Sequence, residues 1–133
     1  MEKYPLCQCE VCPLRSQPFV HPEGPEDAHV LVIGQAPGRE EVRLKRPFVG
    51  LPGLLLEQGL KLSGKKREDV RIDNTVLCFV PPGTKPEIGA LYACFPHIED
   101  AIKRAKVIVP MGNEALQALQ RVLEPQTAEG VPF

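Results

Sequence analysis

The 133-residue sequence predicts an α/β fold built on a short, mainly parallel sheet. Three short apolar runs, rich in β-branched residues, predict strands at residues 30–34, 70–76 and 107–109. Each run is followed by apolar residues at helical spacing, which predict helices at residues 54–62, 88–105 and 113–124. This alternation of strand and helix is typical of a parallel sheet with right-handed crossovers.

The N-terminal residues 1–28 differ in composition from the rest of the chain. They are rich in Cys, Pro and polar residues, and we expect them to be irregular, with one short helix near Cys12–Ser16. The first strand, 30–34, is a continuous apolar run and is therefore predicted to be buried on both faces. A loop at 35–52 should follow it.

Glycine and proline residues predict where the later helices end or bend. Gly64 should end the helix at 54–62, and Pro96 should kink or restart the helix at 88–105. The run at 107–109 is predicted to be a third buried strand. Because a three-stranded parallel sheet leaves exposed edges, we expect a further strand beyond the residues of this sequence.

The composition is that of one globular domain spanning residues 1–133. Apolar residues make up 43%, charged residues 25%, and the formal net charge is −1, so no overall basic field indicates nucleic acid. Two basic groups are either solvated faces or a local basic surface: Arg39, Arg43, Lys45, Arg46 and Lys61, Lys65, Lys66, Arg67. The sequence contains neither an apolar run of about 20 residues nor a signal-peptide pattern, which predicts a cytoplasmic protein without membrane attachment.

The turn after the first strand is the strongest indication of a binding site. Gly34-Gln35-Ala36-Pro37-Gly38 would bring backbone N–H groups to the carboxyl edge of the sheet, where open α/β sheets bind ligands. The carboxylates of Glu40 and Glu41 follow, and then the aromatic ring of Phe48. An ordinary solvated loop between a strand and a helix is the alternative interpretation.

Five cysteines are many for a cytosolic protein of this length: Cys7, Cys9, Cys12, Cys78 and Cys94. Disulfides are disfavoured in that compartment, so metal binding is the better interpretation. Four thiolates suit a [4Fe–4S] cluster or, less well, zinc, because zinc ribbons pair two close Cys-x-x-Cys knuckles. The alternative is that Cys78 and Cys94 are small buried residues. Cys7 could replace Cys9 as a ligand.

Taken in order, these motifs resemble those of the iron–sulfur, family-4-like branch of the uracil-DNA glycosylase superfamily. The resemblance covers residues 9 to about 120 and is carried by an ordered set of short segments. They are Cys9-x-x-Cys12-Pro-Leu, residues 34–38 with Glu40-Glu41, Arg46-Pro47-Phe48-Val49-Gly50 with Gly53, Asn74-Thr75-Val76-Leu77-Cys78, Cys94-Phe95-Pro96, and residues 106–115.

The resemblance implies a three-layer α/β/α fold and a role for each motif. The loop holding Gly34, Gln35 and Ala36 would contain the acidic machinery that directs water. Phe48 would stack on an extruded uracil, and the Asn74 amide would read its Watson–Crick edge. A structural [4Fe–4S] cluster would be held by four cysteines: Cys9, Cys12, Cys78 and Cys94.

The sequence departs from the family pattern in two places. Gln35 stands where most such proteins have Glu, and a Gln side chain can orient water but cannot take its proton as a carboxylate can. We therefore expect Glu41, or failing that Glu40, to be the catalytic carboxylate. The His-Pro-Ser-like motif that follows a fourth strand in the family is missing, so we expect a domain truncated at its C-terminus and weakly active.

The resemblance implies a monomeric hydrolase of base excision repair that acts on single- or double-stranded DNA. It would cleave the N-glycosidic bond of uracil flipped out of the strand. The alternative, from a different functional class, is a catalytically weak or inactive iron–sulfur domain that binds DNA.

Overall fold

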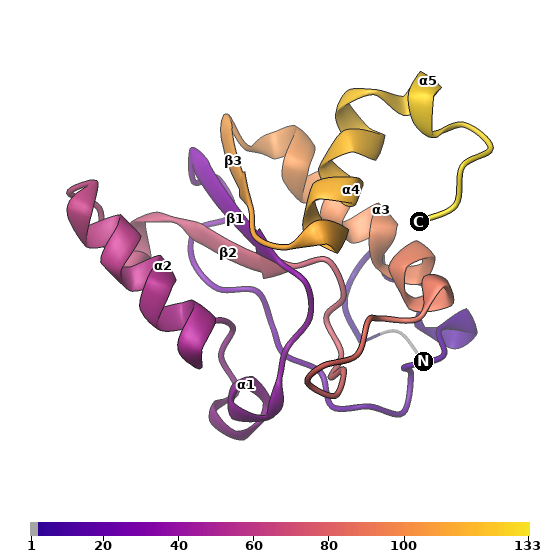
Figure 1. Ribbon diagram of the computed structural model, residues 1–133, viewed down its shortest axis with the longest axis horizontal. Helices are drawn as coiled ribbons and strands as arrows, with labels where there is room; N and C mark the ends of the chain where they lie inside the picture. Colours follow the sequence, from indigo (N-terminus) through magenta and orange to yellow (C-terminus); the bar gives the residue numbers. More distant parts are fainter. Residues whose placement is uncertain (1–2) are drawn as a thin grey trace.

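Three parallel strands form the centre of the structure in the order β2-β1-β3 (Figure 1). The computed structural model describes residues 3–133, with the backbone alone at residues 127–128. The strands are β1 (Val30–Gly34), β2 (Arg71–Asn74) and β3 (Val107–Pro110), and β1 pairs in parallel with both neighbours. The predicted α/β fold with a short parallel sheet is confirmed.

Five α-helices and two short 3₁₀ helices connect and cover these strands in the described part of the chain. They are η1 (Cys9–Val11), α1 (Arg39–Leu44), α2 (Leu51–Leu62), η2 (Arg67–Asp69), α3 (Ile88–Arg104), α4 (Asn113–Leu123) and α5 (Pro125–Ala128). No helix within residues 3–133 is both long enough and apolar enough to cross a membrane.

Successive residues of β1 point to opposite faces of the sheet, and this alternation builds two apolar layers. Leu31 and Ile33 pack against α3 and α4, whereas Val32 packs with Leu56 and Leu60 of α2. Figure 1 agrees, with α2 on one side of the sheet and α3 and α4 on the other. The central strand is therefore buried on both faces, as its continuous apolar run predicts.

The third strand is not buried as the sequence predicts. Val107 is 53% exposed and Val109 is 40% exposed. Both side chains lie on the face that α2 covers, but the α2 layer packs over β1 and β2 and leaves that face of β3 uncovered. The position of β3 at the edge of the sheet thus decides an exposure that the β-branched run alone cannot.

Several predicted boundaries also need correction. The short N-terminal helix is at Cys9–Val11 rather than near Cys12–Ser16, and the expected loop at 35–52 contains α1 and the start of α2. The long helix α3 runs through Pro96 without a restart. The last helix, α4, buries Ala115 and Ala118 in the core, with Leu119 and Val122 packed partly buried beside them.

Candidate functional site

The carboxyl ends of all three strands meet at one point. Gly34, the last residue of β1, is paired with Asn74, the last residue of β2. On the other side, the backbone N–H of Met111 donates to the carbonyl of Ile33 at 2.8 Å, which brings the end of β3 alongside. Thr75 links the ends of β1 and β2 by donating two hydrogen bonds to the Gly34 carbonyl, from its N–H and from its hydroxyl, each at 2.8 Å.

A cavity of about 230 Å³ lies at this edge. It is smaller than the roughly 300–1,000 Å³ of pockets for drug-sized ligands, and this favours a ligand with a single ring. Eight residues line it, and six of them were expected from the sequence to bind substrate or act in catalysis. The lining consists of Gly34, Gln35, Ala36, Glu41, Phe48, Pro52, Asn74 and Met111.

Phe48 and Asn74 converge on Gly34. A methyl group added to Gly34 would lie 2.5 Å from Cζ of Phe48 and 2.6 Å from Oδ1 of Asn74, so only glycine leaves room for both side chains. Both are buried, and the Asn74 side chain makes no hydrogen bond with any other described residue. The site therefore brings an aromatic ring and an amide without a hydrogen-bond partner among the described residues to the same small cavity.

The two predicted carboxylates have different surroundings. Glu41 lines the cavity and accepts three backbone N–H bonds, from Gly38 at 2.9 Å, Val49 at 3.0 Å and Gly50 at 2.8 Å. A carboxylate has about four acceptor positions, so one remains. Glu40 lies outside the cavity lining, and its exposed carboxylate pairs with Arg43 at 2.6 Å.

The cysteines gather at a second place, away from the cavity at the sheet edge. A small cavity of about 10 Å³ is lined by all five cysteines, which come from η1 and the residues on either side of it, from the segment after β2, and from α3: Cys7, Cys9, Cys12, Cys78 and Cys94. The irregular N-terminal segment reaches this cavity because it is bound to the later chain. The backbone of Phe19 forms an isolated antiparallel β-bridge with that of Cys78, and the N–H of Gln8 donates to the Ala93 carbonyl at 2.9 Å.

Three of the buried sulfurs accept hydrogen bonds from nearby nitrogen donors, but burial opposes the ionisation of two of them. N–H groups of Lys3 and Leu14 donate to Cys9 and Cys12, and the Lys3 ammonium donates to Cys78 at 3.3 Å. Burial raises the pKa of the Cys12 and Cys78 thiols. Stable thiolates here therefore need a cationic partner in addition to these donors.

Thiol donors suit iron–sulfur clusters and zinc by their chemistry, but the sulfurs here are not spaced for a single ion. Among residues 3–133, no group of three or more His, Cys, Asp or Glu side chains is close enough to hold one metal ion. A four-iron cluster holds its ligand sulfurs farther apart than one tetrahedral ion does. Cys7 donates to Cys94 at 3.9 Å, so the cavity would have to open to admit a cluster.

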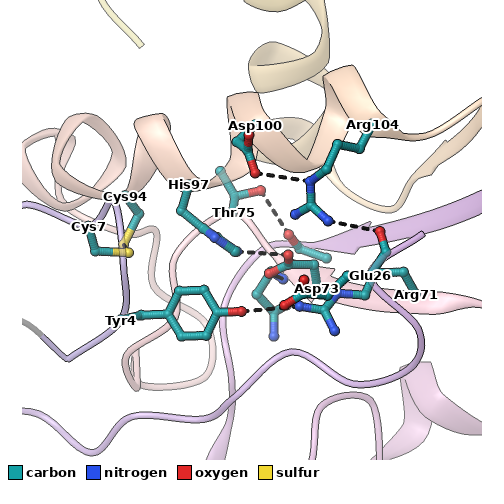
Figure 2. A network of polar contacts seen from close by, with 12 residues as sticks. Tyr4, Cys7, Glu26, Arg71, Asp73, Thr75, Cys94, His97, Asp100 and Arg104 are labelled. Carbon is teal, nitrogen blue, oxygen red and sulfur yellow. Dashed lines mark hydrogen bonds and ion pairs between the residues drawn. The ribbon is translucent and has the colours of Figure 1, made fainter. Parts of the chain in front are cut away.

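The core also holds a buried carboxylate–imidazole pair that the sequence reasoning missed. Figure 2 shows His97 pointing at Asp73, with Nε2 2.8 Å from Oδ2, and Tyr4 beside them. The other oxygen of Asp73 accepts the backbone N–H of Asn74 at 2.8 Å. The available signal was an acidic residue inside the apolar run at 70–76, together with a histidine on the buried face of the helix at 88–105.

Comparison with known proteins gives consistent results. Residues 21–131 match the profile of the uracil DNA glycosylase superfamily. Two curated relatives are the type-4 uracil-DNA glycosylases of Pyrobaculum aerophilum, 34% identical over 119 residues, and of Thermotoga maritima, 39% identical over 113 residues. These matches cover 86% and 82% of this chain but only 61% and 59% of the relatives, so the chain spans about three fifths of their length.

Proposed function

The chain belongs to the uracil DNA glycosylase superfamily, and we propose that it hydrolyses the N-glycosidic bond of uracil flipped out of DNA, as a base excision repair enzyme. The observation that carries the proposal is the convergence of the Phe48 ring and the Asn74 amide on Gly34. One supplies a stacking face and the other a donor and an acceptor for the edge of a pyrimidine.

In the proposed reaction, water adds to C1′ of the sugar as the bond from C1′ to N1 of uracil breaks. The water proton passes to the Glu41 carboxylate, and uracil leaves as an anion with negative charge on O2 and is then protonated. The backbone N–H groups of Gln35 and Ala36 make no hydrogen bond among the described residues, so they are available to stabilise this charge. In this proposal Glu41 holds the attacking water through its remaining acceptor position, and the side chain of Gln35 helps to orient it. Glu40 is left out because it lies outside the cavity lining.

We propose further that Cys9, Cys12, Cys78 and Cys94 hold a structural [4Fe–4S] cluster, with Cys7 as the fifth, non-ligating thiol. When bound, the cluster would supply a cross-link between the N-terminal segment and α3. The support is the shared cavity and the N–H groups aimed at the sulfurs. The N-terminal segment 1–28 would then depend on the cluster, since it contributes few large apolar side chains to the core.

A uracil-release assay tests the function on a single strand containing one uracil, with a thymine strand as the negative control. Release by the wild type is expected, together with a loss in Gly34→Ala, whose methyl group would occupy the space between Phe48 and Asn74. The matched control is Gly59→Ala, where an added methyl group meets nothing within 4 Å. Binding of the uracil strand without release would contradict the enzyme and favour a DNA-binding domain.

A further inference from the structure

Phe48 has a backbone conformation that a large side chain rarely adopts. Its φ is 53°, in the left-handed region, and it is one of three non-glycine residues with positive φ among those described. Such strain persists only where the surrounding structure imposes it, and it is often found at ligand sites. The groups that impose it on Phe48 are therefore of interest.

The Arg67 side chain binds two consecutive backbone carbonyls, those of Pro47 and Phe48. Its Nη1 donates to the Phe48 carbonyl at 2.7 Å, and its Nη2 donates to the Pro47 carbonyl. The planar guanidinium suits this bridging because its donors are fixed in a fork. The side chain is only 13% exposed and reaches the loop from η2, which is nineteen residues beyond Phe48.

Arg67 is itself held in place by two carboxylates. Oε2 of Glu23 lies 2.6 Å from Nε of Arg67, and Oε1 of Glu57 lies 3.6 Å from Nη1. Glu23 is fixed in turn, because its backbone exchanges two hydrogen bonds with Ile72 of β2, at 2.9 and 2.8 Å. A chain of contacts thus runs from the central sheet through Glu23 and Arg67 to the loop that carries Phe48.

The opposite side of the same loop is also constrained. Glu41 accepts the N–H groups of Val49 and Gly50, and Gly53 approaches so closely that a methyl group there would lie 2.0 Å from the Phe48 carbonyl oxygen. We propose that Arg67 is a positioning residue that holds the Phe48 ring in the orientation in which it stacks on the extruded base. The stacking part of this proposal rests on the proposed function.

The geometric part is tested by NMR on the 133-residue chain, without any substrate. The nearness of the Phe48 ring to Gly34 predicts a nuclear Overhauser effect between the ring protons and the Gly34 α-protons. This signal should be lost or strongly weakened in Arg67→Gln and in Arg67→Lys, which keeps the charge but cannot bridge two carbonyls. The matched control is Arg46→Gln, which removes the other ion pair of Glu23, at 2.7 Å, and should keep the signal. An unchanged signal in a folded Arg67→Lys protein would overturn the proposal.

The functional part is tested by a double-mutant cycle on uracil release. Arg67→Gln should lower kcat/KM roughly 5- to 150-fold, the range set by base–aromatic stacking, and mostly through KM. In a Phe48→Ala background the same change should have less than about a twofold further effect, because the ring it positions is gone. Equal losses in both backgrounds would show that Arg67 acts elsewhere. No release by the wild type would count against the proposed function, and the NMR comparison would still decide the role of Arg67.

Discussion

The imidazole Nε2 of His97 lies 2.8 Å from the Oδ2 atom of Asp73, and both side chains are buried, at 2% and 0% exposure. His97 follows Cys94 by one turn of α3, while Asp73 precedes Asn74 on β2. Figure 2 shows this pair with Cys94 and Cys7 nearby. Tyr4 covers the imidazole, with ring centroids 4.7 Å apart in an edge-on arrangement.

Replacing His97 should destabilise the protein. His97→Phe keeps a ring of similar shape but leaves Oδ2 of Asp73 buried without its partner, which typically costs about 1–3 kcal/mol. Urea unfolding monitored by circular dichroism measures the difference. The control is Lys103→Ala, which removes an exposed pair with Glu99 at 3.7 Å and should change stability by less than about 0.5 kcal/mol. Equal stability of His97→Phe and wild type would contradict a structural role for the pair.

Asn74→Asp should weaken uracil release and allow some release of cytosine. A carboxylate cannot donate to O4 of uracil, but it can accept from the exocyclic amine of cytosine. We expect a loss of roughly 5- to 150-fold in kcat/KM for uracil, the range for one mispaired base contact. Release from uracil and cytosine strands is compared, with Asn113→Asp, at the exposed start of α4, as the matched control. Undiminished uracil release would remove Asn74 from the pocket.

Protein purified without oxygen should be brown, with about four irons and four sulfides per chain. Cys78→Ser should abolish the colour and lower the thermal stability, because a ligand that ties the N-terminal segment to the sheet is lost. Cys7→Ser, which alters a thiol of the same cavity, should keep the colour. Iron and sulfide analysis with visible absorption measures both. A colourless wild type that contains one zinc would exclude the iron–sulfur proposal.

Acid should weaken the contacts that hold the Phe48 loop. Burial by itself would raise the pKa of the Glu23 carboxyl, but hydrogen bonds from Arg46 and Arg67 outweigh burial and hold that pKa below its ordinary value. A lowered pKa in the folded state stabilises the protein above the unfolded-state pKa of about 4.3, and this stabilisation is lost as the pH falls through the folded-state pKa.

The stability difference between wild type and Glu23→Gln should therefore be constant near neutral pH and shrink below about pH 4. Urea unfolding at several pH values measures it. Glu99→Gln, which removes the carboxylate of an exposed pair with Lys103, is the control and should show little difference at any pH. A Glu23→Gln difference that stays constant down to about pH 3 would show that the Glu23 carboxylate does not stabilise the fold.

The sequence by itself was enough to predict the order of strands and helices along the chain, the burial of the central strand and most of the residues that line the pocket. These features depend on local patterns. The apolar run at 30–34 requires burial, and the small residues that follow it require a turn. The turn holding Gln35 could be assigned to a binding site because open α/β sheets bind ligands at the carboxyl edge, and the resemblance to the glycosylase family assigned Phe48 and Asn74 to the same site.

Only the tertiary structure decided what each charged side chain does. Glu41 binds backbone groups up to nine residues away, Asp73 meets a histidine twenty-four residues later, and Arg67 reaches back nineteen residues to Phe48. The exposure of Val107 and Val109 likewise follows from the edge position of β3. The physical reason is that hydrophobic periodicity depends on neighbours along the chain, whereas charged partners and strand coverage depend on how the elements pack in space.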